Sequence, residues 1–247
     1  MIRKGAGLTT RYSRILLKLS GESLGSGDEP FGHERLGGLA QAIARLARSG
    51  VEVGVVVGGG NLFRARSANL DVLNRVTADH VGMLATLMNA TVLRDYLRAE
   101  GARSVILSPR EVSPLSRAFS RDLALPLFKS GTVLIFGGGT GNPFFTTDTA
   151  AALRAVEIEA DVLLKGTQVD GVYDKDPQQH DDAVRFDFLT YDQVIDRRLG
   201  VMDLTAITLC KEKGVPIEVF DITDPGNLKR LLDGEIAGTR VAKEPKP

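Results

Sequence analysis

The sequence predicts an α/β fold, a three-layer α/β/α sandwich around a mostly parallel central sheet. Short apolar runs alternate along the chain with segments whose apolar residues recur at helical spacing. This alternation is typical of a parallel sheet that is covered by helices on both faces. No repeat or low-complexity linker interrupts it between residues 14 and 241, so we expect a single continuous domain.

The first elements read as strand, helix and strand. Residues 14–19 form a short apolar run that ends at Ser20-Gly21, which predicts a strand and a tight turn. Leucine and isoleucine recur at helical spacing over residues 36–46, and Gly50 ends that helix. Residues 51–57 are mostly apolar on both faces, which predicts a buried strand.

The rest of the chain continues the same alternation. The long polar loop after residue 165 is its widest gap. In chain order we expect a helix at 76–98, strands at 104–107 and 132–136, an alanine-rich helix at 147–157, a strand at 161–165, a helix at 203–213, a strand at 216–220 and a helix at 227–233.

The overall composition excludes some classes of function. Lysine plus arginine number 31 and aspartate plus glutamate also number 31, so the chain has no global field for nucleic acid or an anionic membrane. No segment approaches the roughly 18 apolar residues of a membrane span, and the first 13 residues lack the apolar stretch of a secretory signal. The single cysteine, Cys210, lies in a helical apolar pattern and is predicted to be a packing residue. We therefore expect a soluble, cytoplasmic protein.

Two glycine-rich turns follow predicted strands. They are Gly58–Asn61, where Asn61 is a plausible helix cap, and Gly137–Asn142. Such turns let the backbone approach a ligand and aim N–H groups at an anion, although a single one often marks only a tight turn. The dinucleotide-binding fingerprint fails because its third glycine would fall on Phe144, and the Walker pattern is absent.

Cations accompany these turns. Lys18 lies inside the first strand and Lys165 ends a later one, where a lysine is costly unless it meets an anion or a carboxylate. The alternative is a lysine that extends to solvent at a sheet edge. Arg64 follows the first turn closely enough to add a bidentate contact to the same anion.

Carboxylates stand at three informative positions. Asp148 begins the alanine-rich helix and either caps it or holds the lysines in place. Asp203 has the same ambiguity, and a solvated acid is the default for Asp79 within its helix. The three histidines lack the spacing of a metal site or a nucleophile arrangement. Phosphoryl transfer fits this set because it needs positioning and charge neutralisation more than covalent chemistry.

The residues then match a known family. From about residue 14 to 240 the chain resembles the bacterial UMP kinases of the amino acid kinase fold. The matching blocks are KLSGE at 18–22, VVVGGGNLFR at 55–64, ADHVGMLATLMN at 78–89, GGTGNPFFTTDTAA at 138–151, LLKGTQVDGVYDKDP at 163–177 and VMDLTA at 201–206. Residues 107–129 and the loop 25–32 depart from the family pattern.

The resemblance implies an activity and a set of site residues. A UMP kinase transfers the γ-phosphate of ATP to UMP, giving UDP and ADP in de novo pyrimidine nucleotide biosynthesis, without a general base. The implied catalytic residues are Lys18, Lys165, Asp148 and Asp203. The implied ATP contacts are Lys18, Leu19, Ser20, Gly21, Gly60, Arg64, Thr167, Tyr173 and Asp176. The implied UMP contacts are Gly59, Asp79 and the run Thr140, Gly141, Asn142, Pro143, Phe144, Phe145, Thr146 and Thr147.

The same resemblance implies an organisation and partners. We expect a flexible extension at 1–13, an acceptor (UMP) lobe at about 14–160, an ATP lobe at about 161–241 and a polar tail at 242–247. Mg²⁺ would bridge ATP phosphates rather than bind protein ligands. A homohexamer built as a trimer of dimers, activation by GTP and inhibition by UTP are also implied.

Two rival functions stay open at this point. One is another amino acid kinase that acts on a carboxylate or carbamate, against which the Asn142–Phe145 block and Asp79 count. The other is a regulatory protein that senses UMP without turnover. Retention of Lys18, Lys165 and Asp148 argues against pure sensing, because binding alone would not need the whole transfer set.

Overall fold

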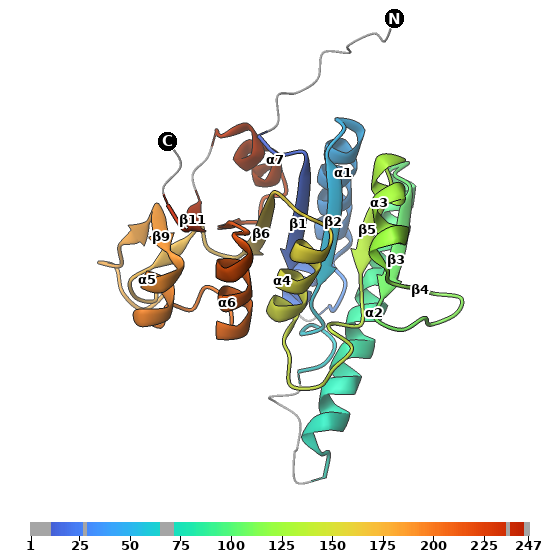
Figure 1. The fold of residues 1–247 in the computed structure, drawn as a ribbon, viewed down its shortest axis with the longest axis horizontal. Coiled ribbons are helices and arrows are strands. Elements are labelled where there is room, and N and C mark those ends of the chain that lie inside the picture. Colours follow the sequence, from blue (N-terminus) through green and yellow to red (C-terminus); the bar gives the residue numbers. More distant parts are fainter. Residues whose placement is uncertain (1–10, 27–28, 65–71, 236–237, 245–247) are drawn as a thin grey trace, which may run out of the picture.

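The computed structural model describes residues 11–26, 29–64, 72–235 and 238–244. Its main feature is a nine-stranded sheet in the order β4-β3-β5-β2-β1-β6-β10-β11-β9 (Figure 1). The strands are β1 (Arg14–Leu19), β2 (Glu52–Val57), β3 (Ser104–Ser108), β4 (Arg117–Ala118), β5 (Val133–Phe136), β6 (Val162–Thr167), β9 (Phe188–Thr190), β10 (Ile217–Asp221) and β11 (Thr239–Ala242). All neighbours in this sheet are parallel except β10 and β11, which confirms the predicted mostly parallel sheet.

Helices cover both faces of the sheet and complete the predicted three layers. They are α1 (His33–Arg48), α2 (Arg75–Ala99), α3 (Arg121–Lys129), α4 (Thr147–Glu157), α5 (Tyr191–Asp196), α6 (Leu204–Lys213) and α7 (Gly226–Asp233), with a 3₁₀ turn η1 (Gly21–Leu24) after β1. Apolar residues of α1, α2 and α7 pack on one face, and those of α3, α4, α5 and α6 pack on the other.

The strands divide their side chains between two cores. Ile15 and Leu17 of β1 contribute to the core under α1, α2 and α7, whereas Leu16 contributes to the core under α4 and α6. The alternation follows from the twofold side-chain period of a strand, so a central parallel strand must be apolar on both faces. Cys210 is fully buried in the second core, and burial raises the pKa of its thiol to about 12, which confirms it as a packing residue.

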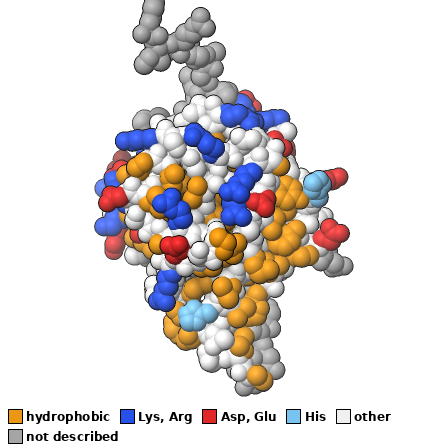
Figure 2. Space-filling model, turned by 90° about the vertical axis from the view of Figure 1, so that its right-hand side faces the viewer, with side chains coloured by type: hydrophobic (Ala, Val, Ile, Leu, Met, Phe, Trp, Pro, Cys, Tyr) orange, Lys and Arg blue, Asp and Glu red, His pale blue; other side chains and the backbone are white. Residues whose placement is uncertain are grey.

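The long helix α2 differs from the others because it extends past the sheet (Figure 1). It covers 25 residues, and its outer surface exposes Val76, Leu84 and Met88. Figure 2 shows hydrophobic side chains gathered along this part of the molecule. The helix therefore has a buried inner surface and an outer surface on which exposed apolar side chains lie among polar ones.

The structure corrects the prediction for Asn61 and adds elements that the sequence did not indicate. Asn61 does not cap a helix, because residues 58–64 form a turn and loop and its side chain bonds to Asn89 and Pro30 instead. The added elements are β4, α3, a two-stranded hairpin of β7 (Val172–Tyr173) and β8 (Arg185–Phe186), β9, α5 and β11.

The ends of the folded part lie slightly outside the predicted limits. Tyr12, which we assigned to the N-terminal extension, is buried and donates a 2.6 Å hydrogen bond to Glu218, while β11 continues to Ala242. The rest of the predicted extension and tail, residues 1–10 and 245–247, lies outside the described residues. The division into two lobes stays a prediction. In the described part of the chain, no helix is both long and apolar enough to cross a bilayer.

Candidate active site

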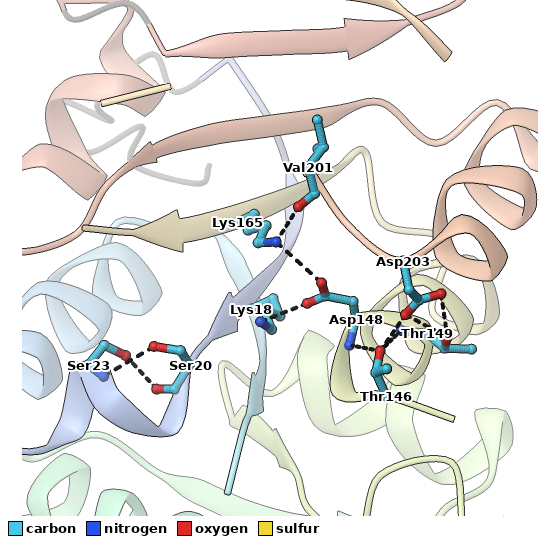
Figure 3. Close-up of polar contacts among 9 residues, drawn as sticks. All are labelled: Lys18, Ser20, Ser23, Thr146, Asp148, Thr149, Lys165, Val201 and Asp203. Carbon is cyan, nitrogen blue, oxygen red and sulfur yellow. Dashed lines mark hydrogen bonds and ion pairs between the residues drawn. The ribbon is translucent and has the colours of Figure 1, made fainter. Parts of the chain in front are cut away.

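The two predicted lysines are neighbours because of strand register. Lys18 of β1 and Lys165 of β6 are direct partners in a parallel pairing, so their side chains leave the same face of the sheet. That face is covered by α4, whose N-terminus carries Asp148. Both lysines are thus directed toward one carboxylate (Figure 3). Lys165 does not end its strand as predicted, because β6 continues to Thr167.

Asp148 joins the two lysines. Its Oδ1 lies 2.7 Å from Nζ of Lys18 and its Oδ2 lies 3.2 Å from Nζ of Lys165. The three side chains are only 9%, 14% and 16% exposed for Lys18, Lys165 and Asp148, so neither lysine extends to solvent at a sheet edge. Helix α4 is capped by Thr146, which leaves Asp148 free for the lysines.

The electrostatics of this cluster leave one positive charge in excess. Burial alone would raise the pKa of Asp148, but the ammonium groups of Lys18 and Lys165 outweigh burial and hold it below the usual 3.8. Burial also lowers the pKa of Lys165 below its ordinary 10.5, against the effect of Asp148. Two ammonium groups around one carboxylate make a partly compensated cationic site, which suits a dianionic or more highly charged phosphate.

Asp203 fixes the position of the helix that carries Asp148. It caps α6 by accepting a 2.9 Å bond from the N–H of Ala206, and it accepts bonds from the hydroxyls of Thr146 and Thr149 at the start of α4. The hydroxyl of Thr146 in turn accepts the N–H groups of Asp148 and Thr149. Asp203 therefore binds the N-termini of α4 and α6 to each other and contacts neither lysine directly.

The segment before Asp203 also reaches the cluster. The ammonium group of Lys165 donates to the carbonyl of Val201 as well as to Asp148. The ammonium group of Lys165 thus lies between the Val201 carbonyl and the Asp148 carboxylate (Figure 3). The block at 201–206 thus contacts Lys165 through the carbonyl of Val201 and the start of α4 through the carboxylate of Asp203. The spacing of residues in the sequence does not indicate these contacts.

The first glycine-rich turn owes several glycines to protein packing. A Cβ on Gly21 would lie 2.4 Å from Oδ1 of Asn61 and 2.6 Å from the N of Gly60, and one on Gly58 would lie 2.9 Å from the N of Gly21. The turns after β1 and β2 therefore pack backbone against backbone. Gly60 is different, since nothing lies closer than 3.7 Å to its added Cβ. Gly60 is therefore the glycine of this turn whose added Cβ would make no close contact with other protein atoms.

Arg64 does not stand free beside this turn. Its guanidinium pairs with Glu22 and also donates to the carbonyl of Gly60. Both side chains of the pair are about half exposed, at 55% and 45%. An anion that recruits Arg64 must therefore compete with Glu22, and the exposure of the pair makes that exchange inexpensive.

The second glycine-rich turn adopts a left-handed backbone at several positions. Gly138, Gly139 and Gly141 have positive φ, and a Cβ on Gly141 would also lie 2.6 Å from Cβ of Pro109. Within the same turn, the hydroxyl of Thr140 bonds to the backbone of Asn142. These glycines are required by the shape of the turn itself.

Asp79 secures the far end of this turn. It accepts a 2.8 Å bond from the N–H of Phe144, whose φ is +73°, and it pairs with Arg75 one helical turn away. The Asp79 side chain is only 10% exposed, so the prediction that it is a solvated acid on the helix surface is wrong. Phe144 and Phe145, both implied UMP contacts, are 65% and 49% exposed, so neither is buried in the core.

Lys165 also lines a cavity of about 460 Å³. The other lining residues include Thr167, Tyr173 and Asp176, three of the implied ATP contacts. Tyr173 donates a 2.6 Å bond to Asp170, which raises the pKa of its phenol. The sequence did not indicate the remaining wall, which includes Val169, Arg197, Arg198, Leu199 and Val201.

The strand order separates the two predicted nucleotide sites. The cavity lies at the end of β6, whereas Gly59 and the turn 137–145 follow β2 and β5. Asp79 of α2 joins the second of these turns through its bond to Phe144. Lys18 of β1 stands between them, since the order is β5-β2-β1-β6. The structure thus brings all predicted site residues to one edge of the sheet, with the Lys18–Asp148–Lys165 cluster in the middle. In the described part of the chain, no group of three His, Cys, Asp or Glu residues is arranged to hold a metal ion.

Comparison with known proteins agrees with this arrangement. The model of the amino acid kinase family matches residues 13–221. The uridylate kinase of Psychrobacter arcticus is 51% identical over 235 residues, which cover 94% of this chain and 98% of that protein. The uridylate kinase of Pseudomonas fluorescens is 48% identical over 243 residues, which cover 98% of each chain.

Solved structures show the same relationship. The crystal structure of UMP kinase from Bacillus anthracis has a TM-score of 0.90 and 34% identity, covering 95% of this chain and 97% of that one. The UMP kinase of Ureaplasma parvum also has a TM-score of 0.90, with 33% identity and coverage of 94% and 100%. The chain therefore belongs to the amino acid kinase family and, within it, to the uridylate kinases.

Proposed function

We propose that this protein is a UMP kinase, which transfers the γ-phosphate of ATP to UMP and releases UDP and ADP. The observation that carries the proposal is the Lys18–Asp148–Lys165 cluster, which lies between a nucleotide-sized cavity and a glycine-rich turn in a chain of the uridylate kinase family. Pockets of some hundreds of Å³ are typical of small-molecule sites.

The proposed chemistry is positioning with charge neutralisation. Lys18 and Lys165 would hold the oxygens of the phosphoryl group during transfer, when negative charge is spread over those oxygens. The acceptor is itself a phosphate oxygen of UMP, so no general base is needed. Asp148 remains ionised because the lysines lower its pKa, and its role is to orient the lysines rather than to accept a proton.

Mg²⁺ is the proposed cofactor, bound by ATP phosphate oxygens. When bound there, it would neutralise charge on the donor phosphates. The carboxylates at the lysine cluster already have partners. Asp148 contacts two ammonium groups, and Asp203 accepts bonds from Thr146, Thr149 and Ala206. This donor set fits a cation that takes its ligands from the substrate.

The remaining site residues receive roles from their position. On the donor side we propose Lys18 to Gly21, Gly60 and Arg64 for the ATP phosphates and Thr167, Tyr173 and Asp176 for adenosine. On the acceptor side we propose Gly59 and the residues 140–147 around UMP. Asp79 would bind the ribose hydroxyls, and it also accepts a bond from the N–H of Phe144. It would therefore support UMP binding both by direct contact and by holding the turn at Phe144.

The proposal extends to assembly and regulation. A homohexamer, formed as a trimer of dimers, is supported by the exposed apolar residues on the outer surface of α2, since contiguous patches of this kind mark interfaces (Figure 2). Activation by GTP, inhibition by UTP, action in the cytoplasm and a place in pyrimidine nucleotide biosynthesis are proposed from the family resemblance.

A substrate panel tests the proposed function. ADP release would be followed with ATP and Mg²⁺ against UMP, CMP, dUMP, aspartate, glutamate and carbamate. We expect turnover with UMP well above that with any other acceptor. Turnover with an amino acid or carbamate would keep the fold and refute the substrate. Binding of UMP without turnover of any acceptor would favour the regulatory protein.

A further inference from the structure

Two polar side chains interrupt the buried surface of α2. The other residues that this helix buries are alanines and leucines, but Thr86 is 3% exposed and Asn89 is fully buried. A hydroxyl or amide is costly in such a place unless it is hydrogen-bonded. The bonds that both side chains make lead to the two glycine-rich turns.

Asn89 connects the turn after β2 to its surroundings. Its Nδ2 donates to the carbonyl of Gly58 at 2.6 Å and to Oδ1 of Asn61 at 2.7 Å. Asn61 returns a bond to Oδ1 of Asn89 and donates to the carbonyl of Pro30 at 2.7 Å. Because the Asn61 side chain also lies against Gly21, one amide pair joins α2 to the turns after β1 and β2.

Thr86 makes the matching contact with the second turn. Its hydroxyl accepts a 2.7 Å bond from the N–H of Gly138, in a buried setting, and donates to the carbonyl of Met83 in its own helix. Next to it, Ala85 packs so closely on Gly59 that a Cβ there would lie 2.9 Å away. A single turn of α2, residues 85–89, therefore touches both glycine-rich turns.

From this geometry we infer that Thr86 and Asn89 are positioning residues for phosphoryl transfer. They fix the turn after β2 and the turn after β5 to one rigid helix, which sets the distance between the donor and acceptor phosphates. This inference rests on the proposed function, and it goes beyond it by giving a role to two residues that bind neither nucleotide in our assignment. Alignment of this kind matters because a displacement of about 1 Å can cost a factor of about 100 in rate.

The test compares threonine variants on the same helix. Thr86→Val keeps the shape of the side chain and removes the hydroxyl, while Thr86→Ser keeps the hydroxyl. Thr91→Val is the matched control, since the Thr91 hydroxyl bonds only to the carbonyl of Leu87 among the contacts described. For each protein the kcat, the KM for UMP, the KM for ATP and the thermal midpoint would be measured.

The expected result separates positioning from general stability. Thr86→Val should lower kcat roughly 10- to 100-fold with a smaller change in both KM values, because the turn is misplaced while nucleotide contacts remain. Thr86→Ser and Thr91→Val should stay within about threefold of the unmodified enzyme. An unchanged kcat in Thr86→Val, or an equal loss in Thr91→Val, would overturn the inference.

A second variant keeps the test decisive if Thr86→Val does not fold. Asn61→Ala removes the partner of Asn89 from a half-buried loop position and should also lower kcat more than it raises either KM. The unmodified enzyme is assayed first with UMP. If it has no turnover, the proposed function fails, whereas turnover that is insensitive to both variants refutes only the positioning role.

Discussion

Asp148 shows how one side chain converts two strand ends into a site. Lysines at paired positions of neighbouring parallel strands would repel each other, and the carboxylate from α4 makes their proximity tolerable. Buried ion pairs of this kind contribute little net stability, but removal of one partner leaves a buried charge uncompensated. The cluster is therefore better explained by the proposed binding of a phosphate than by the stability of the fold.

Asp148→Asn tests this reading directly. Loss of the carboxylate leaves two ammonium groups facing a neutral amide, so turnover should be abolished and the free energy of unfolding should fall by on the order of 3 kcal/mol. ADP release and urea unfolding measure the two effects. Asp192→Asn, which breaks an exposed pair with Lys211, is the control and should leave both unchanged. Retained turnover in Asp148→Asn would remove Asp148 from the mechanism.

The lowered pKa of Lys165 predicts a pH dependence. For a lysine whose pKa is lower in the folded state, the cost of burying its charge is present at neutral pH. That cost is relieved as the pH rises through the lowered pKa toward 10.5. The same deprotonation removes the charge that holds the phosphoryl group, so kcat/KM should fall with rising pH below pH 10.5.

Lys165→Arg supplies the control for this pH dependence. A guanidinium stays charged over the accessible range, so the alkaline fall in kcat/KM should move to higher pH even if the maximum rate is lower. The measurement is a pH profile of kcat/KM for both proteins. An alkaline limb at the same pH in both would assign it to another group.

The sequence predicted the lysines and Asp148 but not the groups that hold Lys165 and the two glycine-rich turns in place. Lys18 and Lys165 are conspicuous because charge at the end of an apolar strand needs a partner. Thr86, Asn89 and Val201 are different. A threonine or asparagine in a helix, or a carbonyl in a loop, gives no local signal, and its role depends on contacts with residues far away in the chain.

The junction of α4 and α6 is the element that orients Asp148. Asp203 caps α6 and accepts from Thr146 and Thr149 of α4, so both helix N-termini depend on one carboxylate. These contacts are confined to the N-termini of the two helices, so the effect of removing Asp203 can be separated from a change in the sheet.

Asp203→Ala should therefore affect stability and turnover together. Loss of the cap should cost about 1 kcal/mol, and release of α4 should lower kcat because Asp148 is no longer held. Thr190→Ala is the matched control, since Thr190 caps α5 with a full capping box away from the lysine cluster. It should lose similar stability and keep its kcat. Equal effects of both variants on kcat would contradict an orienting role for Asp203.

The second glycine-rich turn gives a prediction for the acceptor. Gly141 has a φ of +81°, and an added Cβ would lie 2.6 Å from Cβ of Pro109, so Gly141→Ala must displace the turn. The KM for UMP should rise by about tenfold or more while the KM for ATP changes little. Gly37→Ala in α1 is the control, because nothing lies within 4 Å of its added Cβ. Steady-state kinetics with each nucleotide varied in turn would show the difference.

Elements were predicted well where periodicity is long and poorly where pairing is long-range. The central strands and α1, α2, α4, α6 and α7 have enough apolar residues to reveal their period. Helix α3 was missed because it contains Pro126, which normally argues against a helix interior. Strands β4, β7, β8 and β9 cover two or three residues each and exist only through their partners.

At the scale of the whole molecule, strand order arranges the reaction. The cavity at the end of β6 and the turns at the ends of β2 and β5 flank β1, which carries Lys18. One continuous sheet thus supports the whole proposed site. The proposed adenosine cavity lies on one side of β1, and on the other side lie the turn after β2, which we assign to both nucleotides, and the turn after β5, which we assign to UMP. The sequence predicts a mostly parallel sheet with glycine-rich turns after its strands. The order of the strands depends on long-range pairing, which no local sequence pattern contains.

The outer surface of α2 predicts the assembly. Leu84 and Met88 are 57% and 54% exposed, and a charge placed there should disfavour contact with a second copy. Met88→Lys should therefore give a smaller species than the unmodified protein in sedimentation velocity. Val184→Lys, at an equally exposed position outside α2, should keep the original size. An unchanged mass in Met88→Lys would move the interface away from this surface.

The most direct test of the account follows the phosphate itself. Phosphorus NMR would monitor ATP, Mg²⁺ and UMP with the unmodified protein and with Lys18→Ala, after calorimetry has shown that both bind UMP. We predict that the β-phosphate signal of UDP grows with the unmodified protein and stays absent with Lys18→Ala. Formation of UDP at the same rate by both proteins, or by neither, would contradict phosphoryl transfer to UMP at the lysine cluster.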